Sequence, residues 1–335
     1  MSKRKMRGAG FLMFLVLLSF ILSGCKLGKS NTAVEEIRIG NEGIVMSFLP
    51  NTPPDNIRVD ISAPADIEVA LEVKNKGAYP QPEDGIGAPS GKIYISGYDE
   101  SIVFFPKKEE MLDTKPLEGK STVNPNGGLD VVSFSDGKII TSNMVDIDRY
   151  EPIIQATACY EYVTIASSSV CVDPNPYTTA NIRKVCQATD IPLSSQGAPI
   201  AITGISVKAF AKKTQFRINI KNIGNGDIIK KDRLSMCSPS TLIKRDDIDK
   251  ITVDEVSIGR KQLTCSPMSG RELRVINGET FMICDLTEFA SDSAYLTPIK
   301  IKLSYGYRNT IEKKMTIKRE STGSASSPFS GSAPP

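Results

Sequence analysis

The sequence predicts an all-β protein made of two similar β-sandwich domains. Segments in which apolar and polar residues alternate recur along most of the chain, as in Asp66–Asn75 and Thr214–Asn222, and this period of two is typical of a strand with one buried face. Stretches rich in Pro, Gly, Asn and Asp separate these segments, notably residues 79–91 and 106–128. An internal repeat, described below, relates the two halves of the chain.

Residues 1–24 are predicted to be a secretory signal peptide. Four basic residues and no acidic residue occur among the first seven positions, and an apolar run from Phe11 to Leu22 follows, interrupted only by Ser19. A helix of this length reaches about 18 Å, which is short of the roughly 30 Å hydrocarbon core of a bilayer. A permanent transmembrane span is therefore the weaker interpretation.

The signal ends in Leu22-Ser23-Gly24-Cys25, which resembles the lipobox of exported lipoproteins. The resemblance implies that the Cys25 thiol receives a diacylglyceryl group and that Cys25 becomes the new N-terminus. Two acyl chains give a stable anchor, because each buried methylene adds about 0.8 kcal/mol of membrane affinity. We expect residues 25–35 to be a lipid-anchored tether on the extracytoplasmic face of the membrane. An ordinary cleaved signal beside an incidental cysteine is the alternative.

The net charge of the chain depends on the signal. The full sequence contains 41 basic and 38 acidic residues, and removal of the signal leaves 37 basic residues against 38 acidic ones, a net charge of −1. Nucleic acid binding requires a basic face, so we do not expect a nucleic acid partner.

The six cysteines beyond Cys25 are predicted to form disulfides, because an even set in an exported chain can oxidise and stay oxidised. They are Cys159, Cys171, Cys186, Cys237, Cys265 and Cys284. A metal site is disfavoured, since no two of them have the spacing of zinc ligands and the chain contains no His. Fifteen pairings are possible. A hairpin between Cys159 and Cys171 suggests that these two pair, which would leave the other four to staple the second half with Cys186 at its entrance.

Individual strands follow from the alternation. In the first half we expect strands at 66–75, 92–96, 101–105, 129–134 and 153–163. In the second half we expect strands at 200–209, 214–222, 251–258, 280–284 and 299–305. Lys108–Asp113 is expected to form one or two helical turns. Residues 320–335, mostly Ser, Gly, Ala and Pro, are expected to be a disordered tail.

Two patches of sequence recur at nearly the same offset. Val73–Gly77 aligns with Ile220–Gly224, 147 positions on, and Cys159–Tyr162 aligns with Ser304–Tyr307, 145 positions on. This indicates two copies of one domain, over residues 36–178 and 199–319, joined by a linker at 179–198. The Asn-x-Gly of the first patch suits a turn with positive φ. The Tyr-x-Tyr of the second places both rings on one face of a strand, where packing on a neighbouring sheet is favoured over a ligand platform.

A strand that ends in Val73-Lys-Asn-x-Gly77 resembles the immunoglobulin-like modules of prokaryotic surface proteins, including the CARDB adhesion-related group. The segments Gly43–Pro54 and Asn75–Tyr79 also resemble archaeal surface proteins. The resemblance implies tandem immunoglobulin-like β-sandwiches used in adhesion, as spacers or as envelope subunits. The chain has no Trp and lacks the Cys–Trp–Cys spacing of antibody domains, and each copy exceeds the usual ~100 residues, so loop insertions are expected.

Catalytic signatures are sparse, so we expect a protein that is not an enzyme and has no cofactor. Without His, neither a Ser-His-Asp nor a Cys-His arrangement can form, and no phosphate-binding loop occurs on a strand-to-helix turn. A Ser–Lys hydrolase or a carboxylate pair stays open. The acidic cluster Asp246–Asp249, followed by Asp254 and Glu255, offers oxygen ligands for Ca²⁺, but a solvated turn is favoured because basic residues lie among the acids.

Together these observations predict a non-catalytic surface lipoprotein, held at the membrane by Cys25, that binds a protein partner in adhesion or in an envelope complex. Free strand edges and end loops would make the contacts. A solute- or glycan-binding lipoprotein of a transporter is the alternative, disfavoured by the 7% aromatic content and the lack of Trp. A His-free extracellular hydrolase is the rival from another class.

Overall fold

The computed structural model describes residues 39–320, apart from residues 61, 82–83, 145 and 179–183. The signal peptide, Cys25, the tether and the tail beyond residue 320 lie outside the described residues, so the predictions about them stay predictions. The described residues belong to one compact unit, Ile37–Pro335. No helix among them has the length and apolar character needed to cross a membrane.

Two outer sheets are formed by the alternating segments of each half, and the strands are antiparallel throughout both. The first outer sheet has the strand order β1-β3-β7-β5: β1 (Ile44–Phe48), β3 (Ala65–Asn75), β7 (Leu129–Ile139) and β5 (Val103–Phe104). The second has the order β10-β11-β12-β18-β16: β10 (Ile191–Pro192), β11 (Ile200–Phe210), β12 (Lys213–Asn222), β18 (Glu279–Leu286) and β16 (Thr264–Ser266).

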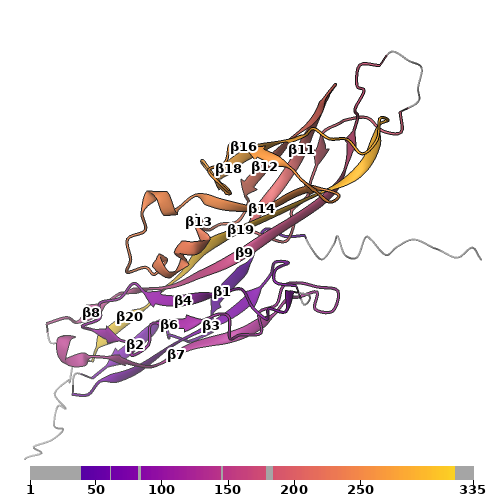
Figure 1. Cartoon of the computed structure of the whole chain (residues 1–335). Coiled ribbons are helices and arrows are strands. Elements are labelled where there is room, and N and C mark those ends of the chain that lie inside the picture. The colour runs from indigo at the N-terminus through magenta and orange to yellow at the C-terminus, as the bar shows by residue number, and fades with distance from the viewer. Residues whose placement is uncertain (1–38, 61, 82–83, 145, 179–183, 321–335) are drawn as a thin grey trace, which may run out of the picture. The chain divides into compact units, whose positions relative to one another are not determined.

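A central sheet contains strands from both halves of the chain. Its main order is β15-β14-β19-β9-β4-β6: β15 (Lys261–Gln262), β14 (Lys250–Ile258), β19 (Tyr295–Lys314), β9 (Ile153–Val172), β4 (Gly91–Ser96) and β6 (Glu109–Met111). Two further strands join it, β13 (Asp227–Ile229) on β19 and β17 (Glu272–Arg274) on β14. The long strands β9 and β19 pair side by side over their whole length of 20 residues (Figure 1).

A small sheet and three short 3₁₀ helices complete the described elements. The small sheet has the order β2-β20-β8: β2 (Asn56–Val59), β20 (Thr316–Arg319) and β8 (Arg149–Tyr150). The 3₁₀ helices are η2 (Thr141–Met144), η3 (Lys231–Met236) and η4 (Arg245–Asp247). Because β20 pairs in parallel with β2, the C-terminal strand completes a sheet that begins near the start of the described chain.

The helical turn expected at Lys108–Asp113 is wrong. The middle of this segment is strand β6, which pairs with β4. Pairing gives its backbone a strand partner and brings Glu109 within 2.7 Å of Lys92, while Leu112 is fully buried. Tertiary contacts therefore outweigh the helix propensity of the charged residues here.

One face of the central sheet forms the protein core. In β9 the alternate positions of Ile154–Tyr162 are buried, as are the alternate positions of Ile299–Tyr307 in β19, and residues opposite each other in the pair point to the same side. The same core cluster includes Leu71 of the first outer sheet and Ile218 of the second. Both outer sheets therefore pack on this face, as two sandwiches that share one sheet.

The two halves follow a pseudo-twofold relation. The outer-sheet strands β1, β3, β7 and β5 correspond in order to β11, β12, β18 and β16, and β9 corresponds to β19. Tyr160–Tyr162 of β9 lies opposite Tyr305–Tyr307 of β19, and the facing pair Glu161 and Gly306 stands at the centre. Exchange of the two strands leaves this pairing unchanged, so the pseudo-twofold axis passes through that central pair.

The all-β sandwich fold is confirmed, and every expected strand overlaps an observed strand. The division into domains 36–178 and 199–319 stays a prediction, because strands of both ranges share the central sheet. Below, the described residues up to 178 are called the first half and those from 184 the second half.

Candidate functional site

Four buried tyrosines meet where the halves join, and we call them the tyrosine junction. They are Tyr160 and Tyr162 of β9 and Tyr305 and Tyr307 of β19. The ring centroids of the two tyrosines from β9 lie 5.8 Å apart, those of the two from β19 lie 6.3 Å apart, and one contact across the strand pair measures 6.0 Å, all within the range of favourable ring contacts. Each ring is at most 2% exposed, which confirms the expected packing on neighbouring sheets.

On the side of the first half, Asn75 closes the tyrosine junction. Its amide nitrogen donates to the carbonyls of Tyr79 (2.7 Å) and Leu117 (2.8 Å). Its amide oxygen accepts from the backbone of Gly77 (3.1 Å) and from the Tyr162 hydroxyl (3.0 Å). The side chain thereby joins a strand end, a loop and the central sheet at one buried point.

On the side of the second half, Asn222 makes the equivalent contacts. Its amide nitrogen donates to the Gly226 carbonyl (2.9 Å), and its amide oxygen accepts from the Gly224 backbone (3.2 Å) and the Tyr307 hydroxyl (3.1 Å). The two patches of the sequence repeat therefore contact each other in each half: the Asn-x-Gly patch holds the second tyrosine of the Tyr-x-Tyr patch. The shared offset in the sequence pointed to both patches, but it did not predict that they contact each other.

The reason given for the glycines of the repeat is wrong. Neither Gly77 nor Gly224 has a positive φ. Instead, a Cβ on Gly77 would overlap the Tyr162 hydroxyl, and a Cβ on Gly224 would overlap the Tyr307 hydroxyl. These positions require glycine because a tyrosine hydroxyl approaches the backbone closely.

The first residue of β1 is held directly by the tyrosine junction. The Ile44 amide donates to the Tyr160 hydroxyl (3.2 Å), and the Ile44 carbonyl accepts from the Asn309 amide nitrogen (2.8 Å). The amide oxygen of Asn309 is buried and has no hydrogen-bond partner among the described residues.

Burial keeps the tyrosine hydroxyls protonated. Desolvation raises the pKa of Tyr160, Tyr162 and Tyr305 well above the usual value near 10, and it also raises the pKa of Tyr307. At neutral pH these groups therefore act as hydrogen-bond donors and acceptors.

Beside the junction lies an open groove of about 230 Å³, which we call the junction groove. It runs between β1 and the C-terminal part of β19, and the turn around Asn225 borders it. Its lining includes Ile44, Met46, Tyr160, Tyr307 and Asn309. Backbone, amide and hydroxyl groups thus face the space, an arrangement suited to binding through hydrogen bonds.

The six predicted disulfide cysteines form three disulfides. The pairs are Cys159–Cys237, Cys171–Cys186 and Cys265–Cys284. The disulfide prediction is therefore confirmed, and the three bonds indicate an oxidising, extracytoplasmic environment.

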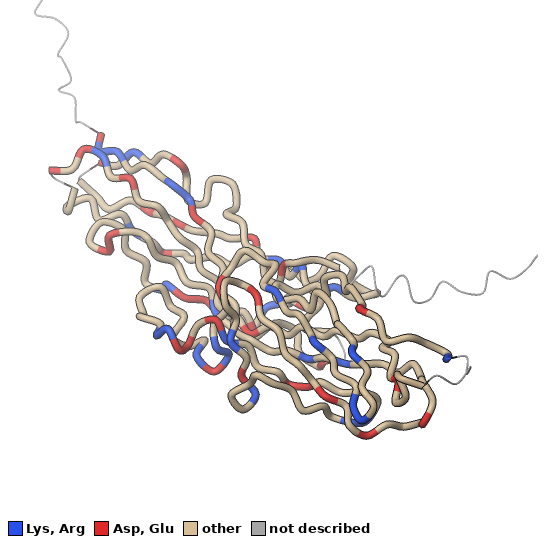
Figure 2. The backbone as a smooth tube through the Cα atoms, turned by 90° about the horizontal axis from the view of Figure 1, so that it is seen from above, with Lys and Arg blue, Asp and Glu red and all other residues tan. Residues whose placement is uncertain are grey.

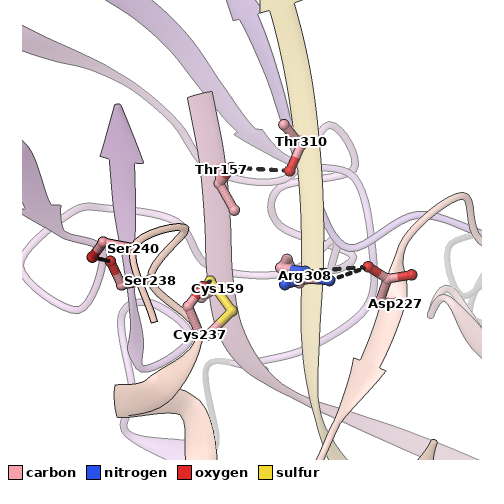
Figure 3. Close-up of a disulfide and its surroundings, with 8 residues drawn as sticks. All are labelled: Thr157, Cys159, Asp227, Cys237, Ser238, Ser240, Arg308 and Thr310. Atoms are coloured by element: carbon pink, nitrogen blue, oxygen red, sulfur yellow. Dashed lines mark hydrogen bonds and ion pairs between the residues drawn. A yellow bond between two sulfur atoms is a disulfide. The ribbon is translucent and has the colours of Figure 1, made fainter. Parts of the chain in front are cut away.

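The pairing suggested for Cys159 with Cys171 is wrong, as is the stapling of the second half by the other four cysteines. The two cysteines lie in the single continuous strand β9, so no hairpin forms between them. Cys159 instead points to the outer face of the central sheet, where Cys237 follows helix η3 (Figure 3). This bond ties the segment between β13 and β14 of the second half to a strand of the first.

Acidic and basic residues are interspersed along the described chain (Figure 2). In the cluster Asp246–Asp249, Asp247 lies 3.5 Å from Arg233, and the nearby Glu255 lies 2.9 Å from Lys300. No group of three or more metal-ligating His, Cys, Asp or Glu side chains occurs within the part of the chain that the structure describes. The geometry fits a surface segment with paired charges.

No protein family matches this chain, and no curated protein shows significant sequence similarity to it.

Proposed function

We propose that this protein is an exported lipoprotein, anchored through Cys25, that binds another protein at the cell surface without catalysis, as an adhesion module or as a subunit of an envelope complex. The basic start, the short apolar run and the lipobox-like Leu22–Cys25 support the export and the anchor. The three disulfides support a position outside the cytoplasm.

The junction groove is the single observation on which the binding role rests. Its exposed polar side chains, such as those of Asn41 and Asn225, offer hydrogen bonds. Its volume of about 230 Å³ lies below the ~300–1,000 Å³ of most small-molecule pockets. Contact with a protein surface or segment therefore fits better than enclosure of a solute.

Cross-linking on intact cells tests this function. A lysine-reactive cross-linker followed by mass spectrometry is expected to join the protein repeatedly to one envelope or surface protein, because a stable complex keeps the same lysines within reach. Links only to abundant surface proteins at random would contradict a specific partner.

The anchor has its own test. The variant Cys25→Ala is expected to shift the protein from the membrane fraction to the medium, and it is expected to abolish labelling by radioactive palmitate. The tether variant Ser30→Ala serves as the control and is expected to stay in the membrane fraction. Retention of Cys25→Ala on the membrane would show that the run Phe11–Leu22 is an uncleaved anchor, and the lipid proposal would fail.

A further inference from the structure

Each half begins an outer-sheet strand at the tyrosine junction with the same pair of contacts. In the second half, the Ile200 amide donates to the Tyr305 hydroxyl (3.3 Å), and the Ile200 carbonyl accepts from the Thr164 hydroxyl (2.6 Å). These contacts correspond to those of Ile44 with the junction in the first half. β1 and β11 are therefore equivalent strands in equivalent positions, and their free edges can be compared residue by residue.

In the second half the chain covers this edge itself. The Ile202 amide donates to the side-chain oxygen of Gln196 (2.8 Å), and the Ile202 carbonyl accepts from the side-chain nitrogen of Gln196 (3.0 Å). Further along the edge, β10 (Ile191–Pro192) pairs with β11 as an added antiparallel strand. The space left beside Gln196 is only about 70 Å³, so the preceding segment of the chain fills the equivalent groove.

In the first half, no residue that the structure describes covers the same edge. Backbone hydrogen bonds at Gly43 and Leu49 fix the alternation with β3, so the amides and carbonyls of Met46 and Phe48 point away from β3. Met46 is the equivalent of Ile202, and it lines the junction groove. Within the described part of the chain, these backbone groups of Met46 and Phe48 have no hydrogen-bond partner.

We infer that the junction groove accepts an extended segment of a partner protein, which pairs with the edge of β1 and places a Gln or Asn side chain against the backbone of Met46. The inference rests on the proposed function and names the class of partner and the place where it binds. The second half provides the precedent, since Gln196 and β10 make these contacts within the chain.

A polypeptide fits the groove better than other ligands. The free edge offers donor and acceptor groups in the spacing of a strand, which another backbone matches group for group. A side-chain amide supplies one donor and one acceptor together, which is what the paired amide and carbonyl of Met46 require.

Site-specific photo-cross-linking on intact cells tests the inference with the full chain. The photoreactive residue p-benzoylphenylalanine replaces Asn225, which is exposed at the border of the junction groove. The matched probe replaces Ala78, the equivalent residue beside the filled groove. We expect the Asn225 probe to join one partner protein and the Ala78 probe to join none.

Two substitutions at Met46 distinguish the contribution of its backbone amide to partner binding from that of its side chain. Met46→Ala keeps the free amide, and Met46→Pro removes it, while proline is tolerated on edge strands. Both lose the same buried side chain, so we expect the cross-link to be at least tenfold weaker in Met46→Pro than in Met46→Ala. Equal cross-linking in the two variants would overturn strand addition.

A measurement without a substitution in β1 covers the case in which Met46→Pro does not fold. A synthetic peptide with the sequence of the cross-linked partner segment is added to the full chain in detergent. We expect it to slow hydrogen exchange of the Met46 amide at least tenfold, and an unchanged rate would overturn the inference.

The identity of the cross-linked species decides the remaining outcomes. A cross-link from Asn225 to residues 1–38 of the chain itself, or to a glycan or lipid, would overturn the inference about a partner protein. If the lysine-reactive cross-linker finds a constant partner and the Asn225 probe finds none, the groove inference fails and the proposed function stands. If neither finds a partner, both fail.

Discussion

The two halves of the protein keep the same buried contacts and differ at their edges. Both hold a tyrosine of the shared sheet with an asparagine, and both fix the first residue of an outer strand through a tyrosine hydroxyl. The edge beyond that residue is covered by Gln196 in the second half, whereas at Met46 in the first half no described residue covers it. The contacts that the two halves share are those that build the sandwich, whereas the contacts that differ lie at the edge strands β1 and β11.

The largest expected effect concerns Cys159–Cys237, the disulfide that closes the longest loop. The double variant Cys159→Ser with Cys237→Ser opens a closed loop with a separation of 78 residues, and its loss is expected to cost about 4.5 kcal/mol in the free energy of unfolding. The variant Cys171→Ser with Cys186→Ser opens a separation of 15 and is expected to cost about 3 kcal/mol. Urea denaturation measures both. The reverse order of costs would mean that the chain-entropy argument does not hold here.

A smaller effect distinguishes the two asparagines. Asn75 is fully buried and makes four hydrogen bonds, so Asn75→Ala is expected to cost about 4 kcal/mol. Asn222 is only partly buried and makes three hydrogen bonds, so Asn222→Ala is expected to cost about 2 kcal/mol. Urea denaturation gives each free energy of unfolding. The control is Asn219→Ala, which removes one hydrogen bond from Arg217 at a partly exposed position and is expected to stay within about 0.5 kcal/mol of the parent. Equal costs would remove this difference between the halves.

The smallest expected effect makes the two edges alike. Gln196→Ala removes two hydrogen bonds from Ile202 and is expected to cost about 1–2 kcal/mol. Hydrogen exchange of the Ile202 amide is expected to accelerate toward that of Met46, and mass spectrometry of proteolytic fragments measures both rates. The exposed Gln187→Ala is the control and is expected to leave both rates unchanged. A slow Ile202 amide in Gln196→Ala would mean that β10 alone protects this edge.

The strands were predictable because a period of two reports one buried face within a few residues, as in Ala65–Asn75. The contacts at the tyrosine junction were partly predictable as well. The sequence repeat aligned Asn75 with Asn222 and Tyr162 with Tyr307, and the structure shows the same asparagine–tyrosine hydrogen bond in each half. What the pattern does not report is which strand pairs with which, because pairing depends on contacts between distant segments.

The errors have the same origin. Cys159 and Cys171 looked like the ends of a hairpin because the length of β9 is set by its partner β19, which lies more than 120 residues further on. The open groove was equally hidden, because Gln196 falls in a segment assigned to a linker and its contacts with Ile202 arise only in the folded sheet. The local sequence pattern shows which face of a strand is buried, whereas the pairing of distant segments decides which strand edges are covered.

The shared sheet also sets the order in which the protein can fold. A ribosome releases β9 long before β19, and until residues 295–314 emerge, one edge of β9 has no partner over its whole length. The last strand, β20, then completes the small sheet with β2 and β8. The first half therefore cannot complete its fold until the end of the chain is present. Until then β9 has a long unpaired edge, which is prone to aggregation. A chain that stops before residue 295 lacks the strand that pairs with both β9 and β14. The native fold can therefore form only after nearly the whole chain has been synthesised.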